Sequence, residues 1–265
     1  MAKMKYKYDI YTCNSGNPTA IIANCNDEKM YKSIAEDIYK KHPNVDQVAV
    51  ILNITKESCT FQLVNGEFCG NACLSVGAFM HEHYKINKGT IINKIKNKND
   101  ASELIEIKSK YDGEKRNLLI PKNLFLEDYN HENTSRYIVK MNGIIHTIIP
   151  QTFGNKNEEY AIKEIKKIEK KITTDVLGII FLENEKIDPF IWIKRIELLQ
   201  HQDSCLSGSI AALEYLQKKE GISKKRIIQP TGEAYDIKFK EKYIDIPGTI
   251  RNIDTGIVEV EENDN

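Results

Sequence analysis

The sequence lacks any apolar run of the roughly 20 residues that a membrane-spanning helix needs. It also lacks an excess of charge, because 38 Lys and Arg residues balance 38 Asp and Glu residues. A neutral chain has little electrostatic attraction for nucleic acid or for an acidic membrane. The residues from Met1 to Tyr8 lack the apolar stretch of a secretory signal peptide. These absences predict a cytoplasmic protein with neither a nucleic-acid partner nor a membrane partner.

Short matches recur in the same order about half a chain apart, which points to an internal repeat. The 265 residues, 41% of them hydrophobic, suffice for one large domain or two ordinary ones. The matched segments are Gly16–Ile22 with Gly143–Ile149, Val48–Leu52 with Leu177–Phe181, Ile107-Lys108 with Ile237-Lys238, Ile120-Pro121 with Ile246-Pro247, and Cys69–Ala72 with Cys205–Gly208. The separation is too long for a solenoid repeat. We therefore predict two copies of one domain, residues 1–125 and 126–265, that meet in the polar segment near 122–136. Whether the last strand returns to the N-terminal half is left open.

Each half alternates short strand-like runs with helix-like segments. Runs rich in Val, Ile and Tyr predict the strands. Helices are predicted at Asp27–Lys41, Asn71–Tyr84, Tyr160–Ile172 and Ser207–Lys219. The strict alternation and glycine-rich turn of a Rossmann domain are missing. The predicted fold class is α/β (α+β), with mixed or antiparallel strands.

Two of the six cysteines precede predicted helices that begin with small residues. Cys69 and Cys205 occupy these positions, and in a reducing cytosol we expect all six thiols to be free. Unpaired N–H groups and the positive end of the helix dipole lower the pKa of a thiol there, and they also cradle a carboxylate. The remaining cysteines, Cys13, Cys25, Cys59 and Cys73, are interpreted as buried packing residues.

Two thiols on opposite faces of one carbon are the smallest set of acid–base groups that can invert a stereocentre. One thiolate removes the Cα proton, and the other thiol supplies a proton from the opposite side. Helix N–H groups that hold the substrate carboxylate would stabilise the enolate-like charge. We therefore expect one active site where the two halves meet, with no cofactor and no metal.

Other interpretations of the same residues stay open. Cys69, Cys73, His81 and His83 form a Cys-x3-Cys and His-x-His pattern that a zinc-stabilised interaction module would need, although one helix gives it poor tetrahedral geometry. A lone cysteine nucleophile is a further possibility, with His201 as the nearest histidine in sequence, interpreted as a solvated loop residue. A catalytically silent amino-acid-binding protein is the non-enzymatic alternative, although it has no chemical need for either thiol.

The segments Asn65–Ala72 and Asp203–Ser209 resemble the paired cysteine motifs of the diaminopimelate epimerase family. Ser15-Gly16-Asn17, Asp46-Gln47-Val48 and Gln229–Gly232 resemble further motifs of that family, so the likeness covers nearly the whole chain. The resemblance implies two pseudo-symmetric domains, each a mixed or antiparallel curved sheet around a central helix, with the active site in the cleft between them. It also implies a homodimer that acts on a small-molecule amino acid.

Departures from the family pattern point to one branch. The family's diaminopimelate epimerases carry polar residues where this chain has Ile144 and Val176, and an arginine where it has Glu197. Those side chains hold the distal amino-acid group of diaminopimelate, so their loss argues against that substrate. The chain looks more like the histidine racemases, which make D-histidine for opine metallophores. The resemblance therefore implies a pyridoxal-independent racemase of histidine, with diaminopimelate or another amino acid as the alternative.

The resemblance also assigns roles to individual residues. It implies that Cys69 and Cys205 are catalytic and that the substrate-binding residues are Asn17, Asp46, Gly70, Asn71, Leu206, Ser207 and Gly208. Asp46 is our candidate acceptor for an imidazole N–H, and its alternative role is that of a turn residue between helix and strand. Leu206 stands where the family has a glycine, so its side chain is expected to narrow the carboxylate cradle.

Overall fold

The computed structural model describes residues 3–95, 104–112, 115–122, 125–129, 137–141, 143–150, 157–170, 174–194 and 197–261. Most of the segment in which the two halves were predicted to meet, near 122–136, lies outside these residues. No helix in this part of the chain is long and apolar enough to cross a membrane.

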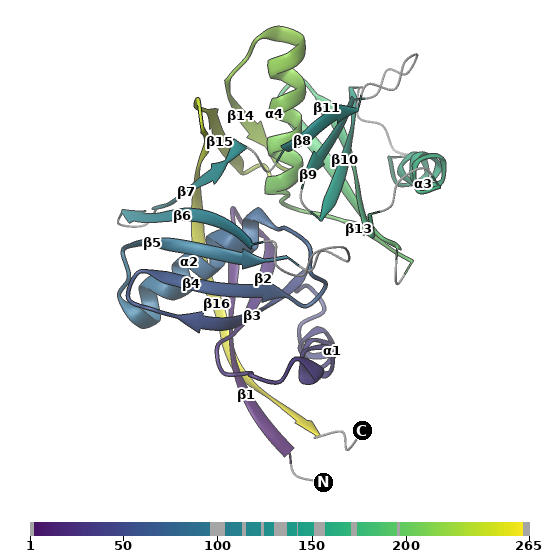
Figure 1. Cartoon of the computed structure of the whole chain (residues 1–265). Helices are drawn as coiled ribbons and strands as arrows, with labels where there is room; N and C mark the ends of the chain where they lie inside the picture. The colour runs from purple at the N-terminus through teal and green to yellow at the C-terminus, as the bar shows by residue number, and fades with distance from the viewer. Residues whose placement is uncertain are drawn as a thin grey trace.

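Eight strands of the first half and the C-terminus close into a barrel (Figure 1). They are β1 (Lys3–Cys13), β2 (Gly16–Ile22), β3 (Gln47–Ile54), β4 (Ser58–Leu63), β5 (Lys88–Lys94), β6 (Leu104–Asp112), β7 (Lys115–Pro121) and β16 (Tyr243–Glu261). The ring closes because β16 pairs with β7 through its first residues and with β1 along the rest of its length. Helix α2 (Gly70–Tyr84) packs against barrel strands, and its first eleven residues are buried. Small residues such as Ala72, Ser75 and Gly77 let the strands approach this helix closely.

The second half is an open sheet that curves around helix α4 (Leu206–Glu220). From β16 outward its strands are β15 (Ala234–Phe239), β14 (Lys224–Ile228), β12 (Lys186–Ile193), β11 (Val176–Glu183), β10 (Ile144–Pro150), β9 (Tyr137–Met141) and β8 (Phe125–Tyr129), with β13 (Leu198–His201) paired to β12. Strand β16 therefore pairs with strands from both halves.

Strand pairing follows the same order in the two halves. From β1 to β7 the successive pairs are antiparallel, parallel, antiparallel, parallel, antiparallel and antiparallel. The path from β9 through β10, β11, β12, β14 and β15 to β16 repeats that order. The central helices also occupy matching positions in the order of elements. Helix α2 follows β4, and α4 follows β13, which pairs with β12. The mixed α+β class predicted from the sequence is confirmed.

Two further helices cover the outer faces of the sheets. Helix α1 (Tyr31–Lys41) follows a short 3-10 turn (Glu28–Met30) and packs on β1 and β16, whereas α3 (Asn157–Ile168) packs on β11 and β12. The predicted helices thus lie within a few residues of the observed ones. The largest difference is at α3, which begins three residues earlier and ends four residues earlier than predicted, with acidic Glu158 and Glu159 in its first turn.

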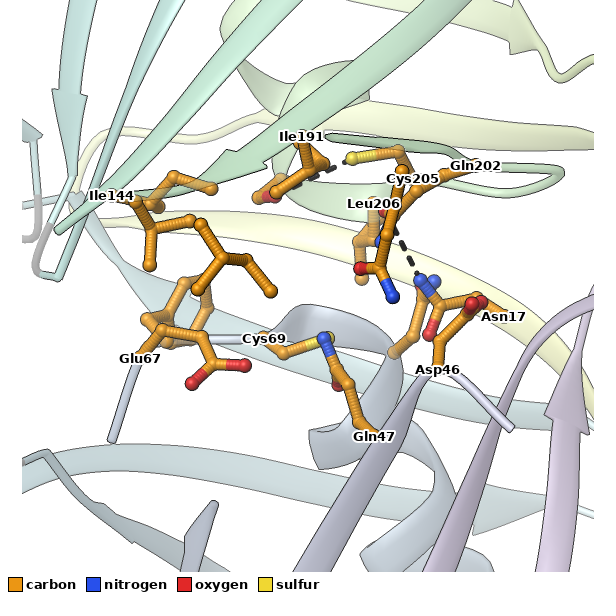
Figure 2. Close-up of a pocket in the computed structure, with 16 residues that line it drawn as sticks. Asn17, Asp46, Gln47, Glu67, Cys69, Ile144, Ile191, Gln202, Cys205 and Leu206 are labelled. Carbon is orange, nitrogen blue, oxygen red and sulfur yellow. Dashed lines mark hydrogen bonds between the residues drawn. The ribbon is translucent and has the colours of Figure 1, made fainter. Parts of the chain in front are cut away.

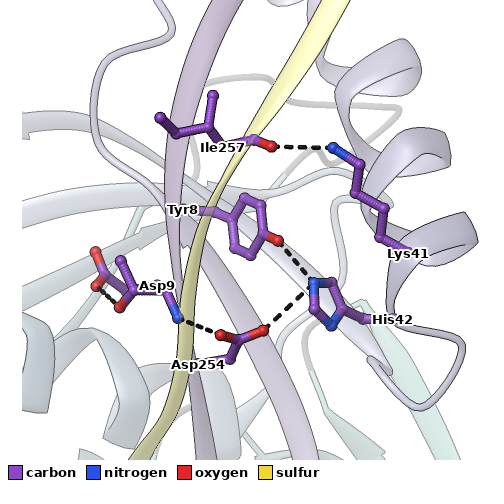
Figure 3. Close-up of polar contacts among 7 residues, drawn as sticks. Tyr8, Asp9, Lys41, His42, Asp254 and Ile257 are labelled. Atoms are coloured by element: carbon purple, nitrogen blue, oxygen red, sulfur yellow. Dashed lines mark hydrogen bonds and ion pairs between the residues drawn. The ribbon is translucent and has the colours of Figure 1, made fainter.

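Polar contacts anchor the end of α1 on the β1–β16 ribbon (Figure 3). Lys41 Nζ donates to the carbonyl of Ile257 at 3.0 Å. His42 Nε2 lies 2.7 Å from the Tyr8 hydroxyl and 3.6 Å from an Asp254 carboxylate oxygen. Tyr8, Ile10 and their neighbours on this face form an apolar cluster with α1, the outer cluster, which is separate from the core around α2 and α4.

Candidate active site

Cys69 and Cys205 occupy matching positions, each as the N-cap of a central helix. Both have extended backbone angles, and the sulfur of each accepts a hydrogen bond from an N–H of the first helical turn. Ala72 N lies 3.5 Å from Cys69 Sγ, and Gly208 N lies 3.3 Å from Cys205 Sγ. A side chain on Gly208 would approach the Cys205 sulfur to 3.1 Å, so the glycine leaves room for this contact. The predicted location of both thiols at helix N-termini matches the structure.

The two thiols line one cavity between the halves (Figure 2). Figure 2 shows Cys205 and Gln202 on one side of it, and Cys69 and Gln47 on the other. Its volume is about 440 Å³ when its mouth is included. Both cysteines that line it are buried.

Most of the residues predicted from the sequence line this cavity. Those that do are Asn17, Asp46, Cys69, Asn71, Cys205, Leu206 and Ser207. Gly70 and Gly208 lie in the first turns of α2 and α4 but are not among the described lining residues. The lining residues that sequence analysis did not assign to the site are Gln47, Glu67, Phe68, Ile191, Ile193, Gln200 and Gln202. Gln47 and Glu67 adjoin Asp46 and the first cysteine in motifs already singled out, so proximity in sequence could have indicated them.

Burial raises the pKa of both thiols, contrary to the lowering predicted from their position at helix N-termini. For Cys69 desolvation is the largest effect, the Ala72 N–H opposes it, and the charge of Glu67 adds to it. For Cys205 desolvation again dominates, opposed by hydrogen bonds from Ser207 and Gly208. The sequence prediction was wrong because it counted the helix N–H groups but not the desolvation of two buried sulfurs.

Asp46 lies just before β3, and its carboxylate faces the cavity. Burial, and then the charge of Asp203, raises the pKa of Asp46 to about 7. Its backbone N–H donates to the carbonyl of Pro18 at 3.0 Å, so the residue also makes the turn contact of its alternative role. A carboxyl group with this pKa changes its charge near neutral pH.

Asn17 presents an unpaired acceptor to the cavity. Its left-handed backbone, with φ of 51°, is one that asparagine tolerates better than most residues. Its side-chain amide donates to Gln202 Oε1 across the interface at 3.2 Å. Its Oδ1 is buried and has no hydrogen-bond partner in the described part of the chain. Gln47 Oε1 is likewise buried and unpartnered among the described residues.

Asn71 reaches the other half of the protein with its side chain. Its Nδ2 donates to the carbonyl of Ser204 at 3.0 Å, and its Oδ1 accepts from the Tyr235 hydroxyl at 2.8 Å. The side-chain amide is therefore occupied by protein contacts, and a ligand at this helical turn would bind backbone N–H groups other than that of Ala72, which donates to Cys69 Sγ.

The histidines of the alternative interpretations lie elsewhere. His81 Nδ1 lies 2.7 Å from Asn87 Oδ1, and His83 Nε2 lies 3.5 Å from an Asp9 oxygen, both near the C-terminal end of α2. No group of three metal-ligating side chains occurs among the residues that the structure describes. His201 is the last residue of β13 rather than a loop residue, and it pairs with Asp188 at 2.5 Å outside the cavity lining.

Comparison with known families decides among these interpretations. Residues 9–257 match the family model described as the histidine racemase CntK N-terminal domain. The chain belongs to this histidine racemase family. The resemblance seen in its motifs is thereby confirmed, and the enzyme is an isomerase of the racemase class.

Curated relatives extend this match over most of the chain. Histidine racemases from Fusobacterium nucleatum strains ATCC 23726 and ATCC 25586 are 29% and 30% identical to it over 250 residues. Each alignment covers 88% of this chain, together with 90% and 89% of the two relatives. A small-molecule amino acid as substrate follows from this family membership.

Solved structures share the fold at much lower identity. A hydroxyproline epimerase from Agrobacterium vitis, with bound trans-4-hydroxy-L-proline, superposes with a TM-score of 0.69 at 9% identity. The match covers 97% of this chain and 93% of that chain. A phenazine biosynthesis protein of the PhzF family from Enterococcus faecalis gives a TM-score of 0.61 at 14% identity, covering 96% and 99% of the two chains.

Proposed function

We propose that this racemase interconverts L- and D-histidine with Cys69 and Cys205 as its two bases and without pyridoxal phosphate or a metal. The observation that carries the proposal is the placement of two thiols from different halves in one cavity, each capping a helix. The homology with histidine racemases supports the substrate. We also propose that residues 1–125 and 126–265 are pseudo-symmetric copies that share β16, which the repeated order of strand pairing supports.

The proposed reaction moves one proton off Cα and another onto its opposite face. A thiolate removes the Cα proton, and the electron pair of the C–H bond moves into the carboxylate to form an enolate-like anion. The opposing thiol then donates its proton to Cα from the other side, so the two sulfurs exchange protonation states in each turnover. Because both thiols are buried, the anionic intermediate forms away from water, where fixed N–H groups stabilise it most effectively.

The first turns of the two helices are the proposed carboxylate site. Backbone N–H groups of Gly70 and Asn71 on α2, and of Leu206 and Ser207 on α4, would hold the α-carboxylate. The N–H of Gly208 donates to Cys205 Sγ, so Gly208 would act through the thiol. The unpaired Oδ1 of Asn17 is the proposed acceptor for the ammonium group. An ammonium ion near the sulfurs would offset part of the desolvation that raises their pKa.

The apolar lining of the cavity favours an uncharged ring over a second amino-acid group. Ile144, Val176, Ile191 and Ile193 supply this lining. Burying an unpaired charged group against such a lining costs several kcal/mol. An imidazole, with an ordinary pKa of about 6.5, is mostly neutral at pH 7. Its ring would pack on the apolar lining while Asp46 accepts a hydrogen bond from a ring N–H.

The cellular setting follows from family analogy and from the thiols. All six cysteines are free and buried in the structure, as suits a reducing compartment. We propose a cytoplasmic homodimer that supplies D-histidine for metallophore biosynthesis.

Incubation of the dialysed enzyme with single L-amino acids in D2O tests this function. We expect deuterium at Cα of histidine together with conversion to the D-enantiomer, and much slower reaction of diaminopimelate and other amino acids. Cys69→Ser and Cys205→Ser should each abolish inversion. Binding of histidine without any Cα exchange would instead identify a silent amino-acid-binding protein, and preferred turnover of diaminopimelate would refute the substrate assignment.

A further inference from the structure

A buried tyrosine joins the two catalytic helices from behind the cavity. Tyr235, on β15, is fully buried, and its hydroxyl donates to Asn71 Oδ1 at 2.8 Å. The same hydroxyl lies 3.0 Å from Ser204 Oγ, and Asn71 Nδ2 closes the triangle by donating to the Ser204 carbonyl. All three residues are buried, so each contact is shielded from water.

This triangle connects the backbone next to one thiol with the backbone next to the other. Asn71 lies two residues after Cys69, in the first turn of α2, and Ser204 directly precedes Cys205. Tyr235 belongs to the second half, so its hydrogen bond to Asn71 crosses between the halves. A separate clamp holds Cys205 within its own half, because Gln229 Oε1 accepts from the Cys205 N–H at 2.8 Å and Gln229 Nε2 donates to Ser209. The Gln229 clamp therefore fixes the position of Cys205 within the second half. The triangle fixes the position of Cys205 relative to α2.

We infer that Tyr235 is a positioning residue for the racemisation, which sets the distance between the two thiols through Asn71 and Ser204. This inference rests on the proposed two-thiol function. Tyr235 is not among the described residues that line the cavity, so it acts through its neighbours rather than on the substrate. A two-base inversion needs both sulfurs in line with Cα at once, and a displacement of about 1 Å costs as much as 100-fold in rate.

The test compares Tyr235→Phe with a matched control, Tyr8→Phe. Tyr8 is also buried and also loses one hydroxyl contact, to His42 Nε2 at 2.7 Å, but it lies in the outer cluster with α1. We expect kcat for histidine to fall about 10- to 100-fold in Tyr235→Phe while KM changes less than about threefold. In Tyr8→Phe both constants should stay near wild type. Melting temperatures measured for both variants show whether each is folded.

A double-mutant cycle tests the coupling between Tyr235 and Asn71, and the single variants Asn71→Ala and Ser204→Ala keep the inference testable if Tyr235→Phe is poorly folded. Asn71→Ala removes the shared partner, so Tyr235→Phe added to it should lower kcat by no more than about a further threefold. Ser204→Ala, which keeps the carbonyl that Asn71 contacts, should lower kcat less than Asn71→Ala. Wild-type kcat in Tyr235→Phe, or kcat losses that multiply in the double mutant, would overturn the inference.

The cysteine variants separate this failure from failure of the proposed function. If Cys69→Ser and Cys205→Ser are inactive while Tyr235→Phe behaves like wild type, the two-thiol proposal stands and the positioning role falls. If either serine variant inverts histidine at the wild-type rate, the two-thiol proposal and the positioning role fall together.

Discussion

Leu206 packs directly against Gly70, and a Cβ built on that glycine would lie 2.5 Å from Leu206 Cδ2. Each residue is the first of a central helix, immediately after a cysteine N-cap. The Leu206 side chain at the start of α4 therefore fills the space left by the missing side chain of Gly70 at the start of α2. This contact explains how a leucine fits at the start of α4, because Gly70 supplies the space.

Gly70→Ala should impair the enzyme through this contact. The added methyl group forces Leu206 away, and overpacking of this kind typically costs about 1–3 kcal/mol. We expect a lower melting temperature and at least about a tenfold loss of kcat/KM, because the shift occurs beside both thiols. The double variant with Leu206→Gly should recover much of the melting temperature and much of kcat/KM. A double variant no better than Gly70→Ala would mean that the two positions are not coupled.

Oxidation should inactivate the enzyme reversibly through a disulfide between Cys69 and Cys205. Both sulfurs line the same cavity, and each is free in the described structure. Peptide mapping of the air-oxidised protein should identify this bridge, and a thiol reductant should restore full activity. Cys25→Ala provides the control, since Cys25 lies in the outer cluster and its loss should change neither result. Inactivation without this bridge would contradict the expected closeness of the sulfurs.

Asp46→Ala should raise KM for histidine more than it lowers kcat. The carboxylate lines the cavity and makes no hydrogen bond to either thiol in the described structure, so its loss removes a side-chain contact to the substrate and leaves the helix caps in place. Loss of one hydrogen bond to a charged group predicts roughly a 10- to 100-fold change. Steady-state kinetics with histidine on both proteins measure it, and unchanged constants would assign Asp46 to the turn alone.

The raised pKa of Asp46 predicts that this residue destabilises the fold above neutral pH. Its pKa is about 7 in the folded chain, against an ordinary value of 3.8, so the folded state holds the proton more tightly. Stability from this group is therefore present at acid pH and is lost as the pH rises from about 4 through about 7. Asp46→Asn should raise the melting temperature more at pH 8 than at pH 5. An equal gain in melting temperature at both pH values would mean that the pKa of Asp46 in the folded chain is close to its ordinary value of 3.8.

Local signals predicted the helices and the cysteine caps, whereas individual hydrogen bonds between the halves could not be predicted from the sequence. Small residues after Cys69 and Cys205 predicted helix starts to within one residue. The bond from Tyr235 to Asn71 links residues 164 positions apart, and no motif around Tyr235 signals it. The thiol pKa was mispredicted for a related reason, since the burial of each sulfur depends on tertiary packing that no local motif reveals.

The pairing of β1 with β16 makes the presence of β16 a condition for completing the barrel. Lys3 to Cys13 pair with Ile250 to Glu261, so β1 completes its pairing only after β16 has been synthesised. The N-terminal half therefore cannot finish folding first, as N-terminal domains commonly do. Contacts this distant in sequence slow folding, and truncation before β16 leaves the barrel with two open edges.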